Sequence, residues 1–263
     1  MTFKITIPNF SLNDTLLCGQ CFRFKNIEDN NFLVFAGNHS SFITQRQDVL
    51  YFDSSNNDIN FWKNYFDTIT DYNKLLQKFD GDTILEKTRH KYYGIRILRQ
   101  DPWETLISFI ISANNNIPRI QSIIERLCEN FGYPIKNGYS FPTASTLANC
   151  KLQDLEILRS GFRAKYILDA AKKVFSGEIN LEGIKCCDIN KSRETLMQIC
   201  GVGKKISECV LLFGYHKMEA FPVDVWMRRA LKEYYPNGLS LQILSCPGLA
   251  QQILFYSKRN RDI

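Results

Sequence analysis

The spacing of hydrophobic and polar positions changes once along the chain. From residue 3 to about residue 53, short runs rich in β-branched and aromatic residues alternate with Asn, Asp and Gly, a pattern typical of strands joined by turns. The runs are FKITI, LLCGQCFRF, NFLVFAG, SSFITQ and VLYF. They predict an antiparallel β-sheet. From INFWKNYF and DYNKLLQKF onward, apolar residues recur at helical spacing. The pattern therefore predicts an α+β protein.

A helix start marks the boundary between the two parts. In RQDPWE, Asp101 can cap a helix, Pro102 suits its first position, and Glu104 lies three residues after the cap. We expect a β-rich N-terminal domain with short helices at its end over residues 1–98, and a helical domain over residues 99–263. Within the latter, helices are predicted in WETLISFIISANN, IPRIQSIIERLCENFG, TASTLANC, LQDLEILRSG and AKYILDAAKKVFSG, the last closed by Gly177.

Residues 188–214 predict a helix-hairpin-helix motif. DINKSRETLMQIC has helical character, Gly201-Val202-Gly203 permits a sharp turn, and KKISECVLLFGY resumes as a helix. The amides at the start of the second helix lack partners and lie at the positive end of the helix dipole, so a phosphate could bind there. Gly201, Gly203 and Lys204 are the expected phosphate contacts, with Lys204 otherwise a solvated charge at the helix start.

Lys205 and Asp224 are the candidate catalytic pair. An amine at a positive helix end and partly shielded from water is favoured in its neutral, nucleophilic form. Asp224, in FPVDVW, is expected to cap the helix VWMRRALKEYY and to lie near the hairpin. From there a carboxylate can stabilise a developing cation or move protons. The capping and catalytic roles are compatible.

Composition and charge indicate which partners and cofactors the protein has. The net charge of +6 and a pI near 8.8 favour an anionic partner, nucleic acid first. The nine cysteines show no regular spacing, and the pair Cys18 and Cys21 lacks a second pair, so neither a metal nor another cofactor is expected. No signal sequence or membrane-length apolar run is evident, which predicts a soluble protein that is not exported. We expect it to be a monomer. We expect it in a prokaryotic cytoplasm or a eukaryotic nucleus.

Taken together, these segments resemble the helix-hairpin-helix DNA glycosylases, and among them the 8-oxoguanine DNA glycosylases. In that family nineteen residues separate the lysine that closes the hairpin from the aspartate of a Pro-Val-Asp, and here 224 − 205 = 19. Three further segments are similar to family motifs, in the same order: LLCGQCFRF, YYGIRILRQDPWETLISFIISANNNIPRI and PGLAQQILFY.

The resemblance implies a bifunctional enzyme acting on double-stranded DNA that contains 8-oxoguanine, preferably opposite cytosine. Lys205 would attack the deoxyribose C1′, expel the base and form a Schiff base that permits β-elimination, and Asp224 would support this step. The extruded base would be held by four residues: Gly19, Cys209, Gln251 and Phe255. The cytosine left behind and the nearby DNA would be contacted by Asn114, Arg119, Phe162 and Arg163.

Plainer interpretations exist for the pocket residues. Without the resemblance, Cys209 and Phe255 would be read as core positions, Gln251 and Gln252 as solvated helix positions, and Gly19 as a strand bulge. The chain also departs from the family pattern. It has Ile199-Cys200 in place of leucine-proline before the hairpin and Trp226 in place of a phosphate-binding histidine. It also has Phe162 in place of a tyrosine that in many members is inserted as a wedge beside the cytosine left behind, so the resemblance implies an aromatic wedge without its hydroxyl.

Two alternative functions remain open at this point. A monofunctional glycosylase for alkylated purines shares the fold and the aspartate, but it uses water and has no need of Lys205. A non-catalytic helix-hairpin-helix DNA-binding protein would use the hairpin for phosphate alone. Asp224 argues against this reading, because a carboxylate near a phosphate site opposes binding.

Overall fold

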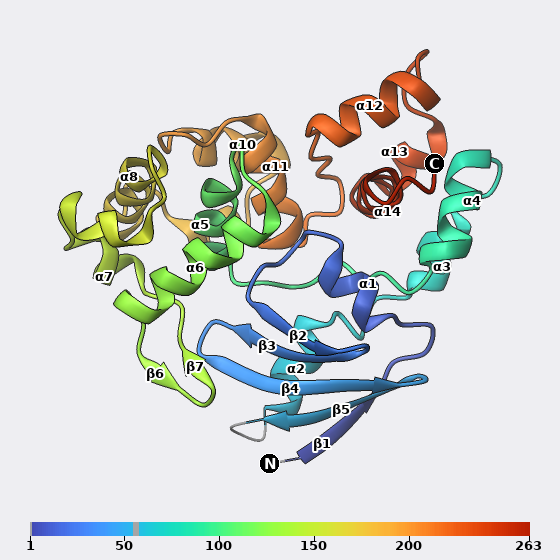
Figure 1. The fold of residues 1–263 in the computed structure, drawn as a ribbon. Helices are drawn as coiled ribbons and strands as arrows, with labels where there is room; N and C mark the ends of the chain where they lie inside the picture. Colours follow the sequence, from blue (N-terminus) through green and yellow to red (C-terminus); the bar gives the residue numbers. More distant parts are fainter. Residues whose placement is uncertain (1, 55–57) are drawn as a thin grey trace.

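An antiparallel sheet forms one end of the molecule and helices form the rest (Figure 1). The computed structural model describes residues 2–54 and 58–263. Its five-stranded sheet has the order β1-β5-β4-β3-β2, with every neighbouring pair antiparallel. The strands are β1 (Thr2–Thr6), β2 (Phe24–Glu28), β3 (Asn31–Ala36), β4 (His39–Arg46) and β5 (Val49–Ser54). The α+β architecture predicted from the sequence is confirmed.

The sheet buries one face because its side chains alternate. In β5, Leu50 and Phe52 are buried whereas Tyr51 between them is exposed. The buried side chains pack with Leu12 and Leu16 of α1 (Leu12–Leu17) and with Trp62 of α2 (Ile59–Tyr65). This N-terminal core is separate from that of the helical body.

One run predicted as a strand is not a strand. Most of LLCGQCFRF forms the end of α1 and an irregular segment over residues 18–23, and β2 begins only at Phe24. Two local features account for this. The Ser11 side chain accepts a hydrogen bond from the amide of Asp14 and so caps a helix. Gly19 then adopts a φ of +84°, which ends any regular element.

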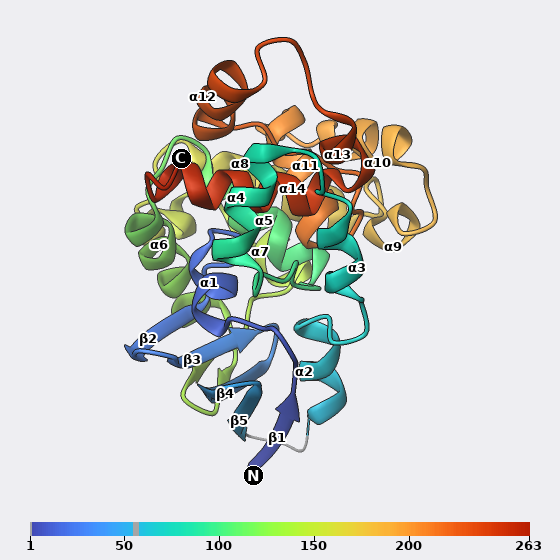
Figure 2. The same cartoon turned by 90° about the vertical axis from the view of Figure 1, so that its right-hand side faces the viewer.

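The helical body follows the predicted helices closely, as Figure 2 shows from the side. Asp101 accepts from the amide of Glu104 at 2.8 Å and Pro102 opens α5, as expected. The larger helices are α5 (Pro102–Ser112), α6 (Ile117–Phe131), α8 (Arg163–Phe175), α10 (Ile189–Met197), α11 (Lys204–Phe213), α12 (Val225–Tyr234) and α14 (Pro247–Arg259). Shorter ones are α7 (Ala144–Ala148), α9 (Leu181–Ile184) and α13 (Leu241–Ser245).

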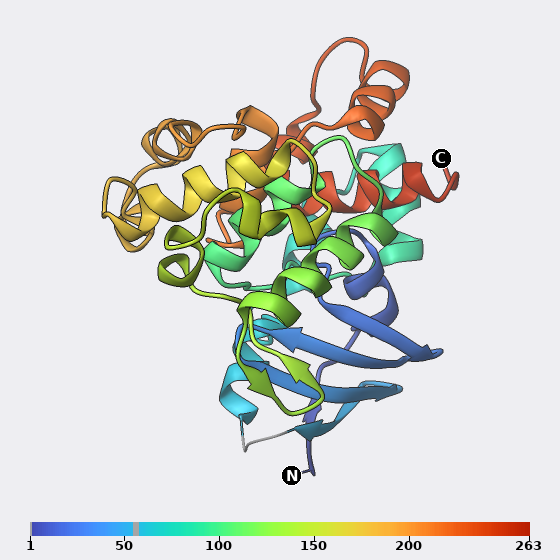
Figure 3. The same cartoon turned by 60° about the vertical axis from the view of Figure 1, so that its left-hand side comes forward.

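Two details of the body differ from the prediction. LQDLEILRSG forms a 3₁₀-helix, η1 (Gln153–Leu158), that ends at Arg159 in the left-handed region. A small hairpin of β6 (Pro134–Ile135) and β7 (Gly138–Tyr139) follows α6 and lies beside the sheet (Figure 3). The amide of Phe141 and the hydroxyl of Ser40 join this region to the sheet by hydrogen bonds. The hairpin thus links the two cores.

The boundary between the two hydrophobic cores does not fall at residue 98, where the sequence placed the domain boundary. Helices α3 (Tyr72–Gln77) and α4 (Thr83–Tyr92) precede that position, yet their buried side chains belong to the core of the helical body. In Figure 1 α4 lies beside α14, and the two helices are in contact. Residues 72–92 therefore support the C-terminal helix rather than the sheet.

Candidate active site

The predicted helix-hairpin-helix motif is present, with α10 and α11 joined by a turn over residues 198–203. Gly201 has a φ of +82°, and a Cβ atom there would lie 2.5 Å from the ring of Tyr166 in α8. Gly203 is the N-cap of α11 and supplies no capping side chain, and a Cβ atom on it would meet nothing within 4 Å. Gly201 is thus required by packing within the protein, whereas Gly203 leaves an open approach to the amides of α11.

Because of this difference, alanine substitutions at the two glycines should destabilise the protein to different extents. Gly201→Ala should lower the free energy of unfolding by about 1–3 kcal/mol, because it combines a strained φ with a steric clash. Gly203→Ala should cost less, up to about 1 kcal/mol, because φ is −95° and the space is open, so that only the preference for Gly over Ala at the N-cap is lost. Denaturant unfolding of both variants measures the contrast. Equal stability of the two would contradict the packing argument.

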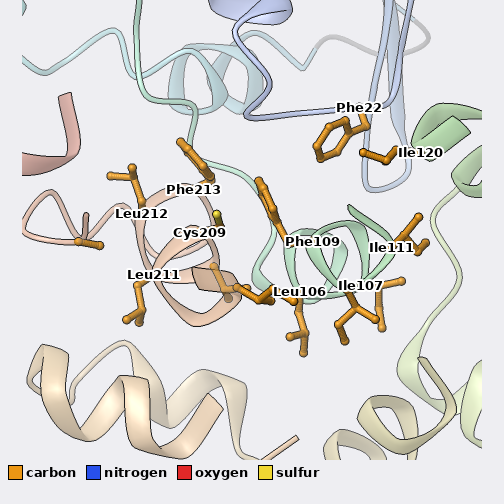
Figure 4. Close-up of a cluster of buried hydrophobic side chains, with 14 of the residues drawn as sticks. Phe22, Leu106, Ile107, Phe109, Ile111, Ile120, Cys209, Leu211, Leu212 and Phe213 are labelled. Atoms are coloured by element: carbon orange, nitrogen blue, oxygen red, sulfur yellow. The ribbon is translucent and has the colours of Figure 1, made fainter. Parts of the chain in front are cut away.

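Lys205 lies in the first turn of α11, half-buried, beside the exposed Lys204. Its Nζ is 5.1 Å from the ring centroid of Phe109 in α5, within the range of a cation–π contact. Phe109 stacks on Phe213 and meets the edge of Phe22 (Figure 4). An apolar aromatic cluster therefore shields one side of the amine from water.

Cys209 connects the two candidate catalytic residues. It is one helical turn after Lys205 and only 3% exposed. Burial raises the pKa of the Cys209 thiol to about 11, Lys205 opposes this shift by charge and a hydrogen bond, and the charge of Asp224 adds to it. The charges of Lys205 and Asp224 thus both reach the Cys209 thiol.

Asp224 caps α12, as predicted. Its Oδ1 accepts a hydrogen bond of 2.8 Å from the amide of Met227, and its backbone is extended. The segment before it is fixed from α11: Oε2 of the buried Glu208 accepts from the amide of Phe221 at 2.8 Å. The other oxygen of Glu208 pairs with Arg193 of α10. Through these bonds the hairpin helices set the position of the aspartate.

The candidate base pocket has one wall from residues 18–20 and one from α14. A Cβ atom on Gly19 would lie 3.4 Å from the ring of Phe255, so the two residues are neighbours. Gln252 donates to the carbonyl of Cys18 at 2.7 Å and joins the walls. The placement of Cys209 on α11 and Phe255 on α14 as two faces around a base stays a prediction.

Gln251 is buried, not solvated as its sequence context alone suggested. The residue is 4% exposed, and its Oε1 accepts no hydrogen bond from any residue that the structure describes. A buried amide oxygen without a partner costs about 1–3 kcal/mol. Such an atom is suited to bind a ligand that carries its own donor.

The residues predicted to contact the opposite strand lie around the N-termini of α6 and α8. Asn114 and Arg119 are exposed, and Asn114 has a φ of +48°. Arg163 is only 3% exposed and donates to the carbonyls of Ala113, Asn114 and Ser160. The structure thus gives Arg163 a bracing role on the Asn114 turn that the sequence did not predict, and direct contact of Arg163 with DNA stays a prediction.

Phe162 is 50% exposed at the start of α8, as a wedge would require. Its ring meets that of Tyr166 edge-on, with centroids 5.8 Å apart. Tyr166 is the residue that packs on Gly201. The exposed aromatic ring is therefore supported by the hairpin through one intervening side chain.

The described part of the chain holds no group of three or more His, Cys, Asp or Glu side chains arranged to bind a metal. Among residues 2–54 and 58–263, no helix has the length and apolar character needed to cross a bilayer.

A glycine hairpin between two helices, with a half-buried lysine in the first turn of the second helix and an aspartate that caps a later one, is the arrangement of a helix-hairpin-helix protein. The chain belongs to the HhH-GPD superfamily of base excision DNA repair proteins, whose family model matches residues 107–238. The model of the 8-oxoguanine DNA glycosylase N-terminal domain matches residues 2–106.

Two curated relatives support this membership. An N-glycosylase/DNA lyase of Saccharomyces cerevisiae is 42% identical over 161 residues, covering 54% of this chain and 42% of the relative. A probable N-glycosylase/DNA lyase of Methanothermobacter thermautotrophicus is 33% identical over 193 residues, covering 64% of this chain and 60% of the relative. The matches thus span 42% and 60% of the length of these relatives.

Solved structures match over nearly their whole length. MBOgg1 in complex with a low-affinity DNA ligand has a TM-score of 0.93 at 37% identity, covering 100% of this chain and 96% of that one. The 8-oxoguanine glycosylase/lyase of Clostridium acetobutylicum, bound to double-stranded DNA with cytosine opposite 8-oxoG, has a TM-score of 0.89 at 36% identity, covering 100% and 99%. A 3-methyladenine glycosylase of Archaeoglobus fulgidus, at 18% identity, shares the fold alone.

Proposed function

We propose that this protein excises 8-oxoguanine from double-stranded DNA and then cleaves the strand at the resulting abasic site. The observation that carries the proposal is the position of Lys205: it opens α11 directly after the glycine hairpin, and its amine lies over the ring of Phe109, 5.1 Å from the ring centroid. The charges of Lys205 and of Asp224 both affect the pKa of the Cys209 thiol. The similarity over the whole chain to the 8-oxoguanine glycosylase/lyase of Clostridium acetobutylicum supports the same activity.

In the proposed reaction, the Lys205 amine first gives up a proton to water and then forms a bond to C1′ of the extruded nucleotide while the bond from C1′ to the base breaks. The bonding electrons leave with the base, which takes up a proton. The positive charge that develops on the sugar is stabilised by the Asp224 carboxylate. The lysine nitrogen, now bonded to C1′, loses a proton, and its lone pair then forms the C=N bond of the protonated Schiff base as the bond from C1′ to O4′ breaks and O4′ takes up a proton. Removal of a proton from C2′ then expels the 3′-phosphate by β-elimination.

Recognition of the base follows from the pocket walls. 8-Oxoguanine carries a hydrogen on N7 that guanine lacks, and the carbonyl of Gly19 is proposed to accept it. The unpartnered Oε1 of Gln251 is proposed to accept from the Watson–Crick edge of the same base. A site that pairs with a donor rejects analogues lacking that donor, because its own buried acceptor is then left unpaired.

Borohydride trapping tests the proposed function. The purified protein is incubated with duplexes that carry 8-oxoguanine, guanine or 3-methyladenine at one position. We expect a covalent protein–DNA adduct and strand cleavage with the first duplex alone. Release of 3-methyladenine without an adduct would instead identify an alkylpurine glycosylase. Binding without base release on any duplex would identify a DNA-binding protein.

The opposite base is expected to matter. Because Asn114 and Arg119 are exposed beside the wedge Phe162, excision should be faster opposite cytosine than opposite adenine. In the double variant Asn114→Ala/Arg119→Ala, the rate opposite cytosine should fall by about 10-fold or more, as for the loss of one or two base contacts of about 1–3 kcal/mol each. The rate opposite adenine serves as the internal control and should change little. Equal losses opposite both bases would contradict a role in reading cytosine.

A further inference from the structure

Arg259, near the end of α14, is a cation that contacts both walls of the candidate base pocket. Its Nη2 donates to the carbonyl of Leu17, two residues before Gly19. A Cβ atom on Gly19 would lie 3.1 Å from Nη1 of Arg259. The guanidinium carbon lies 5.5 Å from the ring centroid of Phe255 and 5.0 Å from that of Tyr256. One side chain thus reaches the Gly19 segment and the helix that carries Phe255.

This arginine does not serve an ordinary surface role. It forms no ion pair with a carboxylate of the described residues, and its Nη1 is buried without an acceptor there. The planar guanidinium instead lies between aromatic rings and a peptide segment, a geometry that suits arginine and not lysine. Its side chain therefore points into the protein, toward the pocket wall.

The Gly19 segment needs such a brace. A cavity of about 900 Å³ borders the segment, lined by residues of β2 and α6 as well as by Gly19 and Arg259. Packed side chains normally hold a buried loop in place, and a cavity supplies none of those contacts. The buried side chain of Gln20 anchors one end of the segment through bonds to Arg96 and Leu98. The bonds made by Gln252 to Cys18 and by Arg259 to Leu17 hold the other end, so the position of the Gly19 carbonyl depends on all three side chains.

We propose that Arg259 is a positioning residue that fixes the Gly19 wall against Phe255 and so determines how selectively the oxidised base is excised. The inference rests on the proposed function. Displacement of a reacting group by about 1 Å can cost about 100-fold in rate. An abasic site has no base to seat, so its attack by Lys205 does not require the Gly19 wall. Loss of Arg259 should therefore impair base excision and spare cleavage of abasic DNA.

The test compares Arg259→Met with Arg261→Met, which removes the same charge from an exposed position two residues away. Met keeps the length of the side chain but cannot donate a hydrogen bond. Each variant is assayed for single-turnover excision of 8-oxoguanine, for borohydride trapping on a preformed abasic duplex, and for thermal unfolding. Arg259→Met should lose about 10- to 100-fold in excision with trapping within about two-fold of wild type. Arg261→Met should resemble wild type in both excision and trapping.

Arg259→Lys supplies a second comparison. A lysine can donate to the carbonyl of Leu17 but does not stack as a plane, so its excision rate should lie between those of wild type and Arg259→Met. Excision by Arg259→Met within two-fold of wild type would overturn the inference. So would equal losses of excision and trapping, which would show a general structural role. Absence of excision and trapping in wild type would overturn the proposed function itself, a different result.

Discussion

Replacing Lys205 with Gln should abolish base excision and borohydride trapping while duplex binding is retained. Gln is a good helix former of similar length, so α11 should persist, and the net charge at the hairpin falls by one. The loss of the nucleophile is expected to reduce single-turnover excision by more than about 10³-fold. The measurement is excision and covalent capture on a duplex carrying 8-oxoguanine, together with a binding titration on the same duplex.

The adjacent lysine provides a matched control. Lys204→Gln removes the same charge from the same turn of α11, but Lys204 is exposed, whereas Lys205 lies over Phe109. Lys204→Gln should therefore keep covalent capture and lose some affinity, with a salt dependence of binding reduced by about one counterion. A covalent adduct that persists in Lys205→Gln and disappears in Lys204→Gln would reverse the assignment.

The sequence alone was enough to predict Lys205 and Asp224 as the candidate catalytic pair, because the features that mark them are local. Gly201 and Gly203 mark the turn, Lys205 opens the next helix, and Asp224 precedes a helix that it caps in the structure. Each of these features depends on a few neighbouring residues, and such features are the ones that sequence patterns report well. The fixed interval between the lysine and the aspartate then joined two local signals into one site.

The residues that support the pocket were missed because their roles depend on distant partners. Arg259 bonds to Leu17 across 242 positions in the chain, and Gln252 bonds to Cys18 across 234. No periodicity reports such pairs. The one available signal was the run GLAQQIL, in which two glutamines lie among apolar residues of a helix; all seven of these positions, residues 248–254, are buried in the structure.

The segment LLCGQCFRF was wrongly predicted as a strand for the same reason: contacts with residues far away in the chain decide its structure. Its apolar and aromatic residues suit a strand, but the side chain of Gln20 is buried and hydrogen-bonded. Its Nε2 donates to the backbone carbonyls of Thr15 and Arg96, and its Oε1 accepts a hydrogen bond from the backbone amide of Leu98. The bonds to Arg96 and Leu98, 76 and 78 positions away, hold residues 18–23 as an irregular segment. Tertiary contacts here override the local preference for β-structure.

Asp224→Asn separates the charge of Asp224 from its capping role. Asn is as good an N-cap as Asp, so the hydrogen bond from Met227 and the fold should be preserved. Removing the carboxylate charge should slow base excision by about 100-fold, the usual scale for the loss of one electrostatic group that stabilises a transition state. Binding to duplex DNA should stay the same or tighten slightly, because one negative charge near the phosphates is gone.

Asp224→Ala completes the comparison, because it removes the cap as well as the charge. Its free energy of unfolding should fall by about 1 kcal/mol relative to Asp224→Asn, whereas its excision rate should be similarly low. Full excision activity in Asp224→Asn, with a loss in Asp224→Ala alone, would show that the residue acts through α12 and not through its charge. Both variants retain Lys205, so covalent capture on a preformed abasic site should persist in each. A helix cap and a catalytic carboxylate can thus be distinguished at one position by two substitutions.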